Sequence, residues 1–212
     1  MTILKIQLYA DFTCPFSYMG KRRLDEVMEA SEEPIEFEWR AFQLTPEASK
    51  EKAMPTVELL AKKFHKTYEE TLATTKRLRD QAANEFGLTY NYETMLAPNT
   101  LNAHRLTYWA ATQGKSHEVA EGYFAAIFTH GKDLNREEDV LEVIANAGLD
   151  VEEAKAILRS DAYEADVQAD RSQAIQNGIR SVPSYVINDE ALITGVQPVS
   201  TFVQAINEQR AK

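Results

Sequence analysis

The segment Cys14-Pro15-Phe16-Ser17-Tyr18-Met19-Gly20-Lys21-Arg22-Arg23 is the most informative stretch of this 212-residue chain. It follows the apolar alternation of Ile3–Ala10, so the run predicts a strand, a short loop and a helix. Pro15 fits the first helical position, where its missing N–H costs nothing. Cys14 then lies at a helix N-terminus, where unpaired N–H groups and the positive end of the helix dipole favour thiolate over thiol. Because the thiolate is the nucleophile, we expect Cys14 to be reactive with a low pKa.

The competing interpretation of Cys14 is a small buried hydrophobic residue, the usual state of a lone cysteine. A second feature argues against it, namely the segment Ser181-Val182-Pro183-Ser184-Tyr185-Val186-Ile187. A proline at the beginning of a strand is tolerated only at an edge or at the first residue. A cis peptide bond before Pro183 would be a specific structural feature, because most bonds before proline are trans.

Hydrophobic periodicity and turn residues divide the rest of the chain into elements. Strands are expected at 3–9, 35–41, 184–188 and 191–194, the last two joined by a turn at Asn188-Asp189. Helices are expected at 18–30, 55–65, 68–86, 100–113, 116–130, 137–147, 151–159, 161–177 and 198–210. The helix stops are Gly87, Gly114, Gly131, Gly148 and Gly178, and the residues near helix starts are Asn99, Asp150 and Asp161.

Several segments, in this order along nearly the whole chain, resemble the DsbA family, and in detail its cytoplasmic, FrnE-like branch. They are Asp11-Phe12-Thr13-Cys14-Pro15-Phe16, Tyr18-Met19-Gly20-Lys21-Arg22-Arg23, Trp39-Arg40-Ala41-Phe42-Gln43-Leu44, Asn99-Thr100 with Ala103-His104-Arg105-Leu106, Gly178-Ile179-Arg180-Ser181-Val182-Pro183-Ser184 and Gly195-Val196-Gln197-Pro198. The resemblance implies an α/β protein with a thioredoxin-like fold and a large all-helical insertion. In this interpretation 1–48 and 178–212 form the core, helix 161–177 leads back into it, and 49–160 is a helical insertion domain.

The chain departs from the family pattern at the position three after Cys14, where members commonly carry a second cysteine. Here that residue is Ser17, and the chain contains no other cysteine. An internal disulfide is therefore excluded, and with it the oxidation of a vicinal dithiol. A mixed disulfide on Cys14 must be released by an external thiol, which predicts monothiol chemistry.

Three residues are expected to carry catalysis. Cys14 is the nucleophile, and the Ser17 hydroxyl faces the same first helical turn, where it would donate to the sulfur or else satisfy the backbone. Pro183, if its bond is cis, presents the backbone of Val182 to an extended substrate beside Cys14, as an added strand would be bound.

Further substrate-binding candidates come from position and from the resemblance. Phe12 and Phe16 flank the thiol and are expected to line an apolar groove, with Pro15 between Cys14 and Phe16. The resemblance implies that Asn99 and His104 lie close to the active centre. A nearby imidazolium would lower a thiol pKa and move protons, although a lone helical histidine is more often packed or exposed.

The leading hypothesis is therefore a monothiol thiol-disulfide oxidoreductase or disulfide isomerase. A second hypothesis is a glutathione-dependent isomerase or transferase similar to 2-hydroxychromene-2-carboxylate isomerases and kappa-class glutathione transferases, which carry serine where this chain has Cys14. A third is a non-catalytic thioredoxin-fold adaptor or thiol sensor. No bound cofactor is expected, although glutathione or another small thiol is a candidate co-substrate, and the sequence shows no metal-ligand spacing.

Composition limits the partners and the compartment. Lys and Arg number 23 against 33 Asp and Glu, and the resulting charge of −10 argues against nucleic acid or an anionic membrane as the main partner. The expected partner is a disulfide-containing protein or a small thiol, and a homodimer is possible through the helical block. The N-terminus has no signal-peptide pattern, and one unpaired cysteine fits a reducing compartment, so we expect a cytoplasmic protein.

Overall fold

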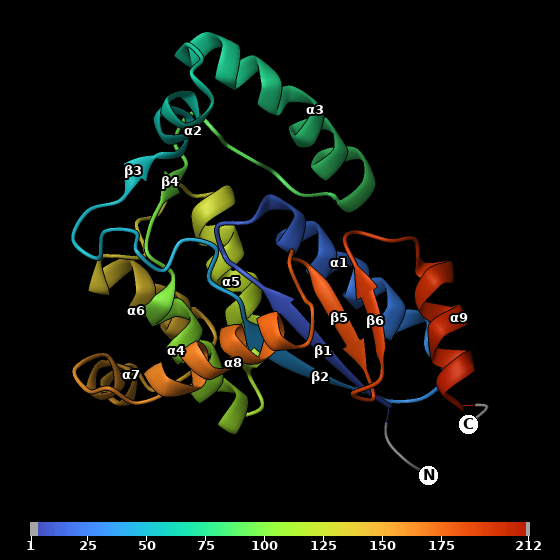
Figure 1. Cartoon of the computed structure of the whole chain (residues 1–212). Helices are drawn as coiled ribbons and strands as arrows, with labels where there is room; N and C mark the ends of the chain where they lie inside the picture. Colours follow the sequence, from blue (N-terminus) through green and yellow to red (C-terminus); the bar gives the residue numbers. More distant parts are fainter. Residues whose placement is uncertain (1–3, 211–212) are drawn as a thin grey trace.

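A four-stranded sheet forms the centre of the computed structural model, which describes residues 4–210 (Figure 1). The strands β1 (Leu4–Ala10), β2 (Ile35–Ala41), β5 (Ser184–Ile187) and β6 (Ala191–Thr194) lie in the order β2-β1-β5-β6. β1 runs parallel to β2 and antiparallel to β5, which is antiparallel to β6. These strands confirm the sequence expectations within a residue or two; residue 3, the expected start of the first strand, lies outside the described residues.

The helices also follow the predicted order. They are α1 (Pro15–Ala30), α2 (Thr56–Phe64), α3 (Tyr68–Phe86), α4 (Leu101–Thr112), α5 (Ser116–Phe128), α6 (Glu137–Asn146), α7 (Val151–Leu158), α8 (Glu164–Gln176) and α9 (Val199–Arg210). The first helix begins at Pro15, which confirms the expected first helical position and lies three residues before the expected range 18–30. The helix expected at 161–177 begins only at Glu164, because Tyr163 adopts a left-handed conformation with φ 62°.

The sheet is covered by helices from both ends of the chain. In Figure 1, α8 crosses in front of β1 and β2, whereas α1 lies behind the β5–β6 hairpin. The core between the sheet and the helices includes Ile6 and Leu8 of β1, Tyr185 and Ile187 of β5, and Phe202 of α9, all with no exposed surface. Alternation in β1 and β2 thus places the apolar residues against the helices, as the period of two requires.

Helices α2 to α8 all lie between β2 and β5 in the sequence, as expected of an insertion. This segment is not entirely helical, because β3 (Met54–Pro55) pairs with β4 (Leu96–Ala97) in a second small sheet. Two residues per strand leave too little alternation for the sequence to reveal it. The division into a core and a separate insertion domain stays a prediction.

Lys21 joins the first helix to the insertion although it is only 1% exposed. Its ammonium pairs with Asp25 at 3.0 Å on α1 and with Glu121 at 3.1 Å on α5. Tyr18 donates to the same Glu121 carboxylate at 2.7 Å. A buried cation is tolerated only when paired in this way, so the contact fixes α1 against α5.

Candidate active site

Cys14 is the N-cap residue of α1, with extended backbone angles of φ −88° and ψ 115°. Its N–H donates to the Asp11 carbonyl at 3.0 Å, and its own carbonyl accepts from the Ser17 N–H at 3.0 Å. These bonds form the tight turn between β1 and α1 that the Cys-Pro pair predicted. The thiol is 6% exposed and packs among apolar residues, namely Tyr9, Phe42, Ala174, Ile179 and Val182.

The second segment singled out in the sequence meets the first at the sulfur. The Cys14 thiol donates to the Val182 carbonyl, with Sγ and the oxygen 3.6 Å apart. The bond between Val182 and Pro183 is cis, and the Gly195 N–H donates to the Pro183 carbonyl at 2.8 Å. The backbone ahead of β5 is therefore held directly beside the thiol.

Gly20 allows this close approach of Pro183 to α1. A Cβ atom at residue 20 would lie 2.6 Å from Cγ of Pro183 and would also collide with the Tyr185 hydroxyl. Real Cβ atoms do not tolerate such contacts, so the absence of a side chain at Gly20 is a packing requirement. The sequence segment contained Gly20, but its packing role shows only once β5 is placed.

Burial raises the pKa of the Cys14 thiol above its ordinary value. Hydrogen bonds from the Ser17 hydroxyl and from the N–H groups of Ser17 and Phe16 oppose this rise, and the nearby Asp11 carboxylate adds to it. The expectation of a low pKa is therefore wrong in direction. The helix amides are present as predicted, but desolvation of the charged sulfur outweighs them.

Ser17 serves both of the roles weighed for it. Its side chain has no exposed surface and accepts a hydrogen bond from the Asp11 N–H at 3.4 Å. Its hydroxyl also stabilises the Cys14 thiolate, since its hydrogen bond lowers that pKa. The side chain thus links the end of β1 to the sulfur.

His104 lies beside the turn that carries Cys14, and among the described residues it bonds to Trp39 and Asp11 rather than to the sulfur. It has no exposed surface; Trp39 Nε1 donates to its Nδ1 at 3.1 Å, and its Nε2 lies 3.3 Å from Asp11 Oδ1. Phe12 packs against both of these aromatic side chains: it stacks on Trp39 with ring centroids 4.7 Å apart, and its centroid lies 4.8 Å from that of the His104 ring. Phe12 is also fully buried. Phe12 is a core residue and does not line a surface groove.

Asp11 is the residue at this site that sequence reasoning missed. Its carboxylate accepts from the Leu44 N–H at 2.9 Å and from the Thr13 hydroxyl at 3.0 Å, besides facing His104. Burial by itself would raise the pKa of Asp11, but the contacts with His104 and the Leu44 N–H hold it below its usual value. Its position three residues before Cys14 at the end of a strand was the available signal.

Asn99 supports the loop that follows β2. Its amide donates to the carbonyls of Pro46 at 3.1 Å and Ala48 at 2.8 Å, and its Oδ1 accepts from the Leu101 N–H at 3.0 Å. It is 4% exposed. Asn99 thus accepts from the first N–H of α4, but the N-cap residue is Thr100, which makes no side-chain capping bond, so the expected cap is misplaced by one residue. A role of Asn99 in binding substrate stays a prediction.

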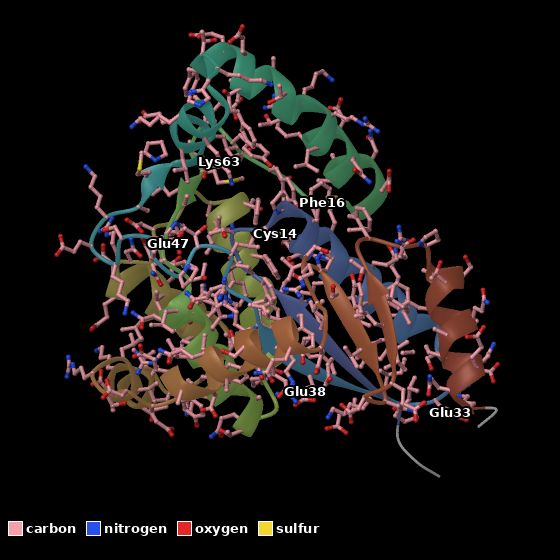
Figure 2. The ribbon with its side chains drawn as sticks, viewed as in Figure 1. Cys14, Phe16, Glu33, Glu38, Glu47 and Lys63 are labelled. Atoms are coloured by element: carbon pink, nitrogen blue, oxygen red, sulfur yellow. The ribbon has the colours of Figure 1, made fainter. Side chains whose placement is uncertain are left out.

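Phe16 and Pro15 remain at the surface next to the thiol. The Phe16 side chain, labelled in Figure 2, is 47% exposed, whereas the Pro15 carbonyl accepts a hydrogen bond from the Tyr90 hydroxyl at 2.6 Å. An exposed aromatic ring two residues from the sulfur offers an apolar contact for a partner. Phe16 is the predicted binding residue that the structure leaves accessible.

Some absences among residues 4–210 also bear on the site. No group of three or more His, Cys, Asp or Glu side chains in that range is arranged to hold a metal ion. Within the same range, no helix combines the length and the apolar character needed to cross a membrane.

Comparison with known proteins places this geometry in a family. Residues 5–207 match the DSBA-like thioredoxin domain. The chain therefore belongs to the DSBA-like thioredoxin domain family, which confirms the resemblance seen in the sequence and the fold class. The match covers both the sheet and the helices between β2 and β5.

Particular relatives show how far the likeness extends. The chain is 25% identical to YwbO of Bacillus subtilis over 213 residues, covering 98% of each protein. Its structure resembles that of the probable DsbA oxidoreductase SCO1869 of Streptomyces coelicolor, with a TM-score of 0.91 and 29% identity over 99% of this chain and 91% of the other. A 2-hydroxychromene-2-carboxylate isomerase shares the fold with a TM-score of 0.71 and 18% identity over 97% of this chain and 95% of that one.

Proposed function

We propose that this chain is a thiol-disulfide oxidoreductase or disulfide isomerase that acts through Cys14 alone. The observation that carries the proposal is the sulfur of the only cysteine, held at the N-terminus of α1 and 3.6 Å from the Val182 carbonyl beside Pro183. Family membership supports the reaction class. The absence of a second thiol supports the monothiol form.

The reaction would proceed by two exchanges at sulfur. The Cys14 thiolate attacks one sulfur of a substrate disulfide, forming a mixed disulfide, and the other substrate sulfur leaves as a thiolate that takes up a proton. An external thiolate then attacks the substrate sulfur, forms the new disulfide and releases Cys14 as a thiolate. We propose glutathione or another small thiol of the cytoplasm as this co-substrate.

The backbone beside the sulfur would position the substrate. The Val182 carbonyl now accepts from the thiol, so it is an acceptor that an extended peptide could use once Cys14 ionises. Phe16, two residues after Cys14, offers an exposed apolar contact. Ser17 would stabilise the leaving Cys14 thiolate in the second exchange.

Turnover of a protein disulfide tests the proposal. With excess small thiol, the chain should reduce insulin faster than the thiol alone, and Cys14→Ser should bring the rate back to that of the thiol. A Ser17→Cys variant is the matched partner, because it supplies a resolving sulfur and should form an internal disulfide that the parent cannot form. If the parent never exceeds the background rate, the catalytic proposal fails and a binding role replaces it.

The raised pKa of Cys14 favours one second candidate, a glutathione-dependent enzyme that binds the thiol without covalent attack. A sulfur that is mostly protonated at neutral pH is a weak nucleophile. In that case glutathione should bind saturably to Cys14→Ser, and activity should survive the substitution. The monothiol mechanism requires that activity be lost.

A further inference from the structure

A cavity of about 300 Å³ lies beside the turn that carries Cys14, and it is called the α2 cavity here. Asp11 and Thr13 line it from the side of the turn, and α2, β4 and residues 44–48 close its other sides. Its apolar wall includes Leu44, Leu59, Leu60, Met95 and Ile127. This volume lies at the small end of the range for small-molecule sites, which are mostly apolar with a few polar groups.

Thr56 places an unpartnered polar atom in this wall. The Thr56 N–H donates to the Met95 carbonyl at 2.9 Å, so its backbone is satisfied. The side-chain Oγ1 is buried and has no hydrogen-bond partner among the described residues. A buried hydroxyl without a partner costs free energy, so a polar ligand atom that reaches Thr56 would gain a hydrogen bond that no described residue supplies.

Asp11 determines which end of a ligand can face Cys14. Its carboxylate is already satisfied by the Leu44 N–H, the Thr13 hydroxyl and His104, and it stays charged because its pKa is lowered. A second anion at this end would be repelled at close range. The group that lies next to the turn is therefore uncharged or apolar.

Lys63 supplies the opposite charge at the other boundary of the α2 cavity. Its ammonium forms no ion pair with any residue between 4 and 210 and lies 5.8 Å from the centroid of the Phe64 ring. Figure 2 labels Lys63 on α2 and Cys14 on the turn below it in the view. In a chain with a charge of −10, a free cation at a mainly apolar cavity selects anions locally.

We propose that the α2 cavity binds a small thiol or disulfide whose apolar body carries a carboxylate, with that carboxylate on Lys63. In this arrangement the apolar body of the ligand lies against the apolar wall of the cavity. The Thr56 hydroxyl donates to a polar atom of the ligand, and the sulfur end of the ligand points toward the turn that carries Cys14. The sulfur chemistry rests on the proposed function, whereas the binding does not.

The test measures binding of a probe that has no sulfur. Phenylpropionate and its uncharged amide are titrated into the full chain by calorimetry, with amide shifts in nuclear magnetic resonance locating the site. The α2 cavity should bind phenylpropionate, a ligand of suitable size, with a Kd of about 1 mM, and it should bind the amide more weakly. The shifts should gather at Thr13, Thr56 and 95–97.

Lysine variants test whether the charge of Lys63 contributes to binding of the phenylpropionate carboxylate. Lys63→Met should weaken phenylpropionate binding about three- to five-fold, as expected for an exposed ion pair, and should leave amide binding unchanged. Lys62→Met is the matched control, since Lys62 is its neighbour on α2 but does not line the cavity. Equal binding of acid and amide, an equal effect of both lysine variants, or shifts elsewhere would overturn the proposal.

A separate reaction keeps the two proposals distinguishable. The disulfide of mercaptopropionate should exchange with Cys14 faster than its methyl ester does, and Lys63→Met should remove that preference. Probe binding without any exchange would contradict the proposed function and leave the binding inference supported. Exchange that shows no preference between acid and ester, together with no probe binding, would support the proposed function and contradict the binding inference.

Discussion

The sulfur of Cys14 lies 3.6 Å from the carbonyl oxygen of Val182, a residue 168 positions later in the chain. The contact joins the start of α1 to the segment before β5, which pairs with β1 in the sheet. The thiol therefore donates to a backbone acceptor in an apolar cluster instead of facing solvent. The burial of the sulfur therefore affects the pH at which Cys14 reacts, and the residues around the sulfur control that pH.

The reactivity of Cys14 should rise with pH through the alkaline range. Burial raises the pKa of the thiol, so only a small fraction is thiolate at neutral pH. The alkylation rate by iodoacetamide, followed by mass spectrometry, should still increase above about pH 8.5, the ordinary value for cysteine. Ser17→Ala should slow alkylation at every pH below the plateau, because it removes a donor to the thiolate. A plateau already reached at pH 7 would contradict this prediction.

The same shift should make folding stability depend on alkaline pH. A raised folded pKa means that the folded state favours the protonated thiol, so this contribution is complete below the unfolded pKa of about 8.5. It is lost as pH rises from there through the folded pKa. Urea unfolding between pH 7 and 10 should therefore show a smaller alkaline loss for Cys14→Ser than for the parent. Equal slopes would mean that ionisation of Cys14 is not linked to folding.

Gly20→Ala should lower both stability and disulfide exchange. The added methyl group would lie 2.6 Å from Cγ of Pro183 and against the Tyr185 hydroxyl, so β5 or α1 must shift. Overpacking of this kind costs about 1–3 kcal/mol of unfolding free energy. Tyr185→Phe removes a buried hydroxyl that has no partner among the described residues, and it should stabilise the parent by about 1 kcal/mol. Combined with Gly20→Ala, it should restore stability only in part, since Pro183 remains in contact.

His104→Gln should change stability and leave the pH dependence of Cys14 alkylation unchanged. His104 bonds to Trp39 and Asp11 inside the aromatic cluster and has no contact with the sulfur among the described residues. Gln retains a donor and an acceptor but loses the ring packing, so we expect a loss of about 1–3 kcal/mol. A shifted alkylation profile at a pH where the variant is folded would instead show that the imidazole acts on the thiol.

Phe16→Ala should weaken the use of protein disulfides with little effect on folding. The ring is 47% exposed, so its removal should change the unfolding free energy by about 0.5 kcal/mol or less. The KM for insulin should rise, whereas the rate with a small disulfide should be unchanged. Phe64→Ala is the matched control because its ring is 58% exposed and lies at the end of α2. An equal effect of the two variants would remove Phe16 from the binding surface.

The elements of this fold were predictable wherever their signals were local. The alternation Ile35, Phe37, Trp39, Ala41 marks β2 with the bounds observed, and Gly87 ends α3 in a left-handed conformation with φ 65°. Pairing across the chain has no such local signal. β3 and β4 consist of two residues each, and the left-handed Tyr163 delays α8 beyond what Asp161 suggested.

The candidate site was predictable in position but only partly in chemistry. A Cys-Pro turn and a Val-Pro strand start are each visible in the sequence, and the resemblance to the DsbA family implied that Cys14, Val182 and Pro183 lie at one centre. The direction of the Cys14 pKa depends on how much apolar surface covers the sulfur, which is decided by Phe42 and Ile179 from distant segments. The burial of His104 and Phe12 likewise follows from tertiary packing.

The placement of β5 against β1 also has a consequence for the synthesis of the chain on the ribosome. Lys5 donates its N–H to the Asn188 side chain, 183 residues later, so one edge of β1 stays unpaired until almost the whole polypeptide has emerged. An apolar strand with an open edge is a template for unwanted pairing in a nascent chain. Some intervening helices contact their neighbours in sequence, as α2 contacts α3 and α4 contacts α5, so these pairs can form before β5 is synthesised. Truncation before residue 184 should thus leave an aggregation-prone nascent product rather than a smaller folded one.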